Sequence, residues 1–141
     1  MVALKDLLLP PDMNRDRDTL VEPGEVLTRV TLPALPPGTR AAYHKQTERD
    51  SYDWPICDVA VVLRLERGTV RSAVIAMGWV APTPRKATES EKLLTGRRVD
   101  ESLAREAAKA AVAGATPLSK NGYKVPVLEA VLRRTILAAA G

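Results

Sequence analysis

Charged and aromatic side chains gather in one short stretch of this 141-residue chain. The cluster comprises Lys45, Arg49, Asp50, Tyr52, Asp53 and Trp54. Two interpretations are open. The cluster is either a salt-bridged loop between strands or an edge that contacts an anionic or electron-rich ligand. In the second case the ammonium of Lys45 would stabilise negative charge on the ligand, because an opposite charge nearby favours the charged form. Composition and spacing alone do not choose between the two.

His44 and Cys57 are the only histidine and the only cysteine. A histidine can act as a general base, but no residue that would orient this one is evident, and a solvated histidine of a strand or loop is the alternative. Cys57 stands beside apolar residues and is expected to be a small core residue rather than a nucleophile. One Cys and one His cannot build a Cys/His zinc site or a thiolate-held iron–sulfur cluster. We therefore assign no catalytic residue and no metal ligand.

Several classes of protein are excluded by what the sequence lacks. The eight glycines form neither a G-x-G-x-x-G motif nor a P-loop. The net charge of +4 comes from interspersed charges, without the dense basic run typical of a nucleic-acid-binding arm. The longest apolar runs fall far short of the roughly 20 residues that span a membrane. A single cysteine fits a reducing, cytoplasmic setting.

The first 80 residues carry the patterns of strands. Alternating apolar residues predict a half-buried strand over residues 25–32, and residues 41–47 are a weaker strand candidate. The apolar runs 58–65 and 70–80 flank a short polar turn that contains Gly68. Two such runs around a glycine turn predict a β-hairpin.

Helical periodicity replaces this pattern in the rest of the chain. A Thr-Pro pair at residues 83–84, in the N-cap and first helical positions, predicts a helix over residues 84–95. Asp100 is placed to cap a second helix over residues 100–113. An apolar stripe predicts a third helix over residues 125–139.

Strands first and helices after predict the α+β class. We expect a three- to four-stranded antiparallel sheet with three helices packed on one face, around the predicted hairpin. Leu128 and Leu132 lie on the apolar stripe of the third helix and are expected in the core.

Five stretches stand in an order and spacing that are jointly specific. They read LVEPGEVL at residues 20–27, KQTERDSYD at 45–53, VAVVL at 59–63, GWVAPTPR at 78–85 and PLSKNGYKVPVLEAVLRR at 117–134. Together they resemble the C-terminal domain of the FAD-binding (medium) subunit of molybdenum hydroxylases, the xanthine and carbon monoxide dehydrogenase group. The chain differs from the family pattern in a Gly-Trp pair at 78–79, where the family has Gly-Gly, and in a contracted stretch at 119–122.

Pro10, Pro11, Pro23 and Gly24 interrupt residues 1–24, which are therefore expected to be a lead-in segment. The resemblance implies a CO dehydrogenase flavoprotein C-terminal-like domain at residues 25–141. In this family the domain covers the flavin, while earlier subdomains hold the phosphates of FAD with Gly/Ser-rich loops. Electrons pass from a molybdopterin subunit through iron–sulfur clusters to FAD and an acceptor. The implied partners are a FAD-loop domain, an iron–sulfur subunit and a molybdopterin subunit of a cytoplasmic complex. Neither nucleic acid nor a membrane is expected as a partner.

Lys45 falls where the family places a lysine near the isoalloxazine, and it is the one residue that the resemblance carries over as cofactor-binding. Such a lysine can stabilise charge near N1 and O2 of the ring. Arg49 and Asp53 match the pattern as structural residues. FAD is expected only with the partner domain, and the isolated chain is expected to be inactive, because it lacks a phosphate-cradling loop. The alternative is a stand-alone, non-enzymatic interaction module that kept the fold without the FAD-gripping domain.

Overall fold

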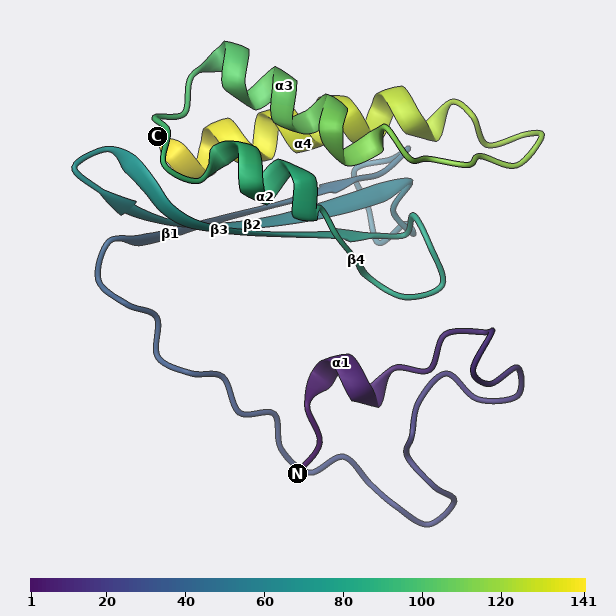
Figure 1. Ribbon diagram of the computed structural model, residues 1–141. Helices are drawn as coiled ribbons and strands as arrows, with labels where there is room; N and C mark the ends of the chain where they lie inside the picture. The colour runs from purple at the N-terminus through teal and green to yellow at the C-terminus, as the bar shows by residue number, and fades with distance from the viewer.

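A four-stranded antiparallel sheet carries three helices on one of its faces (Figure 1). The computed structural model describes residues 1–141. In chain order the elements are α1 (Leu4–Leu7), β1 (Thr39–Gln46), β2 (Cys57–Glu66), β3 (Thr69–Gly78), β4 (Arg85–Lys86), α2 (Thr88–Leu94), α3 (Glu101–Val112) and α4 (Lys124–Ala140). The strands lie in the sheet in the order in which they occur in the chain. The predicted fold class is therefore confirmed.

The predicted hairpin is the pair formed by β2 and β3. Arg67 and Gly68 make its two-residue turn, with φ of 52° and 78°. Both residues lie in the left-handed region, as the turn type that matches the twist of a two-residue hairpin requires. The pairing slips by one residue at a bulge between Arg64 and Leu65. From Arg64 back to Asp58, each residue of β2 therefore pairs with the β3 residue that lies one position later in the chain than an unbroken register from the turn would predict.

The core lies between the sheet and the helices. Alternate residues of the two long strands point to it, and α3 contributes small residues while α4 contributes large ones. The central members are Cys57, Val59, Val61, Leu63, Ile75, Ala104, Ala107, Ala108, Leu132 and Ile136. Alanines on α3 allow this helix to pack closely against its neighbours, and the buried hydroxyl of Ser90 on α2 donates to the carbonyl oxygen of Ala107 at 2.6 Å. The expected packing of three helices on one sheet face is confirmed.

The predicted strand over residues 25–32 is wrong. This segment has no regular secondary structure and pairs with no strand. A strand needs a neighbour to satisfy its N–H and C=O groups, and this segment lies beside neither of the edge strands, β1 and β4. Val26, Val30 and Leu32 are therefore left 79%, 66% and 81% exposed. In Figure 1 the first 38 residues lie on the side of the sheet opposite the three helices.

The start of the first predicted helix is also wrong, by four residues. Pro84 precedes β4, which pairs with the end of β3, and α2 begins only at Thr88. Tertiary contacts set this start. The N–H of Ala87 donates to the carbonyl of Ile75 at 3.0 Å, and the carboxylate of Glu91 accepts from the N–H of Ile75 at 2.9 Å. The contact of Ala87 holds the chain against β3 up to the residue before α2, and the contact of Glu91 ties α2 itself to the same strand.

The other two helices form as predicted. Asp100 caps α3, because its carboxylate accepts from the N–H of Leu103 at 2.7 Å. The third helix, α4, spans Lys124–Ala140 and buries both Leu128 and Leu132. Pro126 lies in the first turn of α4, where the N–H that proline lacks would have no partner within the helix.

Candidate functional site

The sheet face that the helices leave uncovered carries a row of three residues from three strands. Lys45 of β1 lies opposite Asp58 of β2, and Asp58 lies opposite Gly78 of β3. Directly paired residues point to the same face of a sheet. Since the neighbours of Asp58 along β2, Cys57 and Val59, are buried beneath the helices, the row points the other way, into solvent.

A hollow of about 350 Å³ lies over this row. It is lined by Tyr43, Lys45, Tyr52, Asp53, Trp54, Pro55, Asp58 and Trp79. Half of these residues are aromatic. Trp54 and Trp79 meet edge to face, with ring centroids 4.8 Å apart and an interplanar angle of 61°. Aromatic rings gathered on a surface mark an interaction site more often than scattered ones do, and such rings offer faces on which a planar ligand can stack.

Two features of the backbone bring the tryptophans together. The loop between β1 and β2 carries Trp54 and is closed at its base by the N–H of Ile56, which donates to the carbonyl of Gln46 at 2.7 Å. Trp79 follows β3 with φ of 61°, a left-handed conformation that costs a residue with a side chain on the order of 1–3 kcal/mol. The loop and the strained residue therefore place the two rings at one edge of the hollow.

Arg49 and Asp53 pair with each other across the loop, as structural residues would. The Nε of Arg49 lies 2.8 Å from Oδ2 of Asp53, and a second guanidinium nitrogen lies 3.3 Å from Oδ1. Lys45 is exposed and takes part in no ion pair. The structure thus resolves the charged cluster into a salt-bridged loop and a separate lysine at the hollow.

Asp58 lies half-buried on the floor of the hollow, and sequence reasoning missed it. Its carboxylate lies over the Cα of Gly78: a Cβ at position 78 would stand 2.2 Å from Oδ1. Only glycine leaves room for the carboxylate there. Burial, and then the negative charge of Asp58, raise the pKa of Tyr43 above its ordinary value. The floor of the hollow therefore holds a carboxylate, a phenol and an ammonium on neighbouring strands.

His44 and Cys57 do not belong to this site. His44 lies opposite Val59, so it points to the helix side and is half-buried there. Cys57 is completely buried, as predicted for a core residue, and burial raises the pKa of its thiol. No three His, Cys, Asp or Glu side chains gather so that they could hold a metal ion. No helix combines the length and the apolar character needed to cross a membrane.

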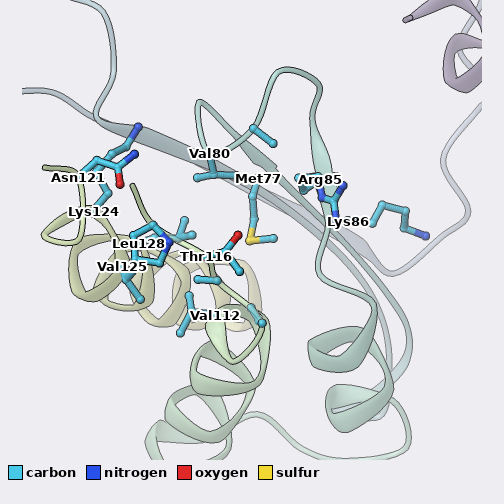
Figure 2. Close-up of a pocket in the computed structure, with 15 residues that line it drawn as sticks. Met77, Val80, Arg85, Lys86, Val112, Thr116, Asn121, Lys124, Val125 and Leu128 are labelled. Carbon is cyan, nitrogen blue, oxygen red and sulfur yellow. The ribbon is translucent and has the colours of Figure 1, made fainter. Parts of the chain in front are cut away.

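A second, larger hollow of about 460 Å³ lies where the end of β3, the C-terminal end of α3 and the N-terminal end of α4 converge (Figure 2). Met77 from the sheet and Leu128 from α4 both line it. Two of its three cationic side chains are engaged, because Lys124 donates to the carbonyl of Trp79 at 2.6 Å and Lys86 pairs with Glu91 at 3.3 Å. This hollow adjoins the contracted stretch at residues 119–122 and contains none of the predicted site residues.

Comparisons with known proteins agree with this fold and extend it to a family. The family model described as "CO dehydrogenase flavoprotein C-terminal domain" matches residues 41–139. The chain is 34% identical over 122 residues to the carbon monoxide dehydrogenase medium chain of Afipia carboxidovorans, covering 84% of this chain and 42% of that protein. It is 28% identical over 141 residues to the FAD-binding subunit of an aldehyde oxidoreductase of Escherichia coli, covering 99% of this chain and 40% of that protein.

A solved structure of a carbon monoxide dehydrogenase has the same fold as this chain. The chain superposes on carbon monoxide dehydrogenase from Hydrogenophaga pseudoflava with a TM-score of 0.77 and 34% identity, covering 86% of this chain and 43% of that one. The chain thus spans less than half the length of the relatives it matches. Sequence, family model and fold agree, and the chain belongs to the CO dehydrogenase flavoprotein C-terminal domain family, the last domain of the FAD-binding subunits of molybdenum hydroxylases.

Proposed function

We propose that this chain is the flavin-facing domain of the FAD-binding subunit of a molybdenum hydroxylase of the xanthine or carbon monoxide dehydrogenase type. The observation that carries the proposal is the aromatic hollow on the uncovered sheet face, with the exposed, unpaired ammonium of Lys45 at its floor. In this proposal residues 1–24 are a lead-in segment and residues 25–141 are the domain.

The residues of the hollow fit a flavin ring. When bound, the flavin would supply the redox chemistry, receiving electrons from iron–sulfur clusters and passing them to an acceptor. The chain's own part is to bind and to orient. The faces of Trp54, Trp79 and Tyr52 suit a planar ring, and Lys45 would stabilise negative charge at the ring edge. None of these residues needs to act as a general acid or base.

The phosphates of FAD must be held elsewhere. A pyrophosphate needs clustered backbone N–H donors, usually at glycines or at a helix N-terminus, and the hollow has no glycine among its lining residues and no helix end. The proposal therefore requires a FAD-loop domain, either earlier in a longer chain or as a partner. It also implies an iron–sulfur subunit and a molybdopterin subunit, as the resemblance to molybdenum hydroxylases predicts.

The competing proposal is a stand-alone interaction module without a redox role. The relatives weigh against it, because their names describe medium chains and FAD-binding subunits of dehydrogenases and oxidoreductases. It would gain support only from a genome that encodes no FAD-loop domain, iron–sulfur subunit and molybdopterin subunit to accompany the chain.

The test is to reconstitute the chain with the FAD-loop domain of its own genome and to titrate FAD. Lys45→Ala should weaken FAD binding or lower the reduction potential of the flavin. It should leave the free energy of unfolding within about 0.5 kcal/mol, as exposed substitutions usually do. Lys109→Ala, an exposed lysine on α3 away from the hollow, is the matched control. Equal affinity and equal potential for all three proteins would refute the proposal.

The chain by itself should not retain FAD through gel filtration, even where the hollow binds a flavin ring weakly at high concentration. Because it lacks the phosphate-binding loop, gel filtration should separate it from added FAD, and its visible spectrum should then show no flavin band. A stoichiometric flavin band after gel filtration would contradict the proposal that a separate FAD-loop domain must hold the phosphates of FAD.

A further inference from the structure

Asp58 is a carboxylate without a charged partner in the middle of the aromatic hollow. It belongs to no ion pair, and neither does Lys45 across from it. Side chains directly opposite in an antiparallel pair have Cβ atoms about 5 Å apart, so a lysine there could reach the carboxylate. The carboxylate instead lies over Gly78, on the side away from β1. The acceptor and the donor therefore stand side by side, each free to meet a ligand.

An ionised carboxylate is an acceptor only, and one that is half-buried loses water that it must replace with another donor. The nearby phenol of Tyr43 can supply one hydrogen bond, whereas a carboxylate has about four acceptor positions. Lys45 has the complementary requirement, because an ammonium offers three donors and no acceptor. A ligand that satisfies both side chains presents an N–H next to a carbonyl group.

We propose that Asp58 is a ligand-binding residue that accepts a hydrogen bond from a ring N–H of a planar heteroaromatic ligand, while Lys45 donates to the adjacent carbonyl. The inference rests on the proposed function and makes it more specific. A flavin has one such edge, where N3–H lies between two carbonyl groups. Asp58 thereby fixes which edge of the ring enters the hollow, and Trp54 and Trp79 flank the ring.

Gly78 has a defined part in this arrangement. With any side chain at position 78, the carboxylate of Asp58 would have to leave its place over the glycine, because a Cβ there would stand 2.2 Å from Oδ1. It would then turn towards Lys45 and form an ion pair. Such a pair would satisfy donor and acceptor within the protein and leave neither for the ligand.

The experiment uses two probes that differ only at the proposed contact, lumiflavin and 3-methyllumiflavin, whose methyl group replaces the N3–H. Binding is followed by quenching of the fluorescence of Trp54 and Trp79, the only tryptophans of the chain. Lumiflavin should bind the unaltered chain at least about tenfold more tightly, since a hydrogen bond to a charged group is lost with the methylated probe. This comparison requires no variant and so does not depend on whether a substitution is tolerated.

Variants then assign the discrimination to one residue. In Asp58→Ala the two probes should bind equally, whereas Asp50→Ala, which removes the same charge from the neighbouring loop outside the hollow, should keep the preference for lumiflavin. Lys45→Ala should weaken both probes. Circular dichroism and a urea titration check that each variant is folded.

The possible failures are distinct. Equal binding of the two probes to the unaltered chain, or a preference that survives in Asp58→Ala, would overturn the assignment of Asp58. If Lys45→Ala still weakens both probes in that case, the proposed function stands. If neither probe quenches the tryptophans, the inference is refuted, while the FAD titration of the chain reconstituted with its FAD-loop domain still decides the proposed function.

Discussion

Replacing Leu132 by alanine should be among the most costly single changes in this chain. Leu132 is completely buried in α4, where the helix packs on α3 and on β1 and β2. The substitution removes about three methylene equivalents, worth about 0.8 kcal/mol each, or about 2.4 kcal/mol of transfer free energy. The paired strands beneath the helix cannot collapse into the space, so a cavity term adds to this. We expect a loss of about 3–5 kcal/mol in the free energy of unfolding.

Leu128, one turn earlier on the same helix, provides the internal comparison. It is 7% exposed and lines the 460 Å³ hollow of Figure 2. Space opened there joins the existing hollow, so Leu128→Ala should lose little beyond the transfer term, about 2–2.5 kcal/mol. Leu118, which is 77% exposed, is the control and should change stability by less than about 0.5 kcal/mol.

Equilibrium urea unfolding measures the free energy of unfolding of all three variants. The values can be compared if the slope of this free energy against urea concentration is the same for each variant. Losses below about 0.5 kcal/mol for both Leu128→Ala and Leu132→Ala would show that this stripe of α4 is not the core. A larger loss at Leu128 than at Leu132 would leave α4 in place but refute the argument from cavity formation.

Three further predictions concern single groups. Asp100→Ala removes the cap on the N–H of Leu103 and should cost about 1 kcal/mol in urea unfolding, whereas Asp100→Asn, also a good cap, should lose much less; equal losses would show that the cap is not what Asp100 contributes. Cys57 is completely buried and burial raises the pKa of its thiol, so a thiol reagent should modify it only as the chain unfolds; rapid modification of the folded protein would contradict this placement. Burial and the charge of Asp58 raise the pKa of Tyr43 in the folded state, so this group contributes stability that is present below the unfolded pKa of about 10 and is lost as pH rises through the folded pKa. Asp58→Asn should lower the pKa of Tyr43 in an ultraviolet absorbance titration, and an unchanged titration would show that the two groups do not interact.

Elements whose determinants are local could be predicted from the sequence. The hairpin of β2 and β3 follows from two apolar runs around a glycine turn, and the start of α3 follows from the cap at Asp100. The start of α2 could not be predicted in this way. The Thr-Pro pair before it has the residue types of a helix start, but the chain is held beside β3 by two hydrogen bonds: the N–H of Ala87 donates to the carbonyl of Ile75, and the N–H of Ile75 donates to the carboxylate of Glu91. These contacts join residues far apart in sequence, and local propensity does not report them.

The segment at residues 25–32 is predicted by its sequence to be a strand and does not form one, for a different reason. Its alternating apolar residues fit a strand, yet a single strand has no stability without a paired neighbour. The apolar side chains of this segment remain exposed, and its backbone pairs with nothing in the sheet. The pattern describes what the segment can do when it pairs with a sheet edge, and in this structure it pairs with neither of the two edge strands, β1 and β4.

The candidate site shows most clearly where sequence reasoning stops. Lys45 could be named in advance, but its neighbours across the sheet could not. The long loop between β1 and β2 does not fix which residue of β2 lies opposite Lys45, and a bulge sets the register of β3 against β2. Counting back from the turn at residues 67–68 would place Asp58 opposite Met77, whose side chain is buried beneath the helices. The bulge between Arg64 and Leu65 moves the pairing by one residue, so Asp58 faces Gly78 instead. A slip of one residue changes which side chains share a face, and here it gives the carboxylate the only neighbour on β3 that leaves room for it. The site therefore depends on a backbone irregularity six residues away from Asp58 along β2, and a deletion that removed the bulge would separate Asp58 from Gly78 even with every residue of the hollow unchanged.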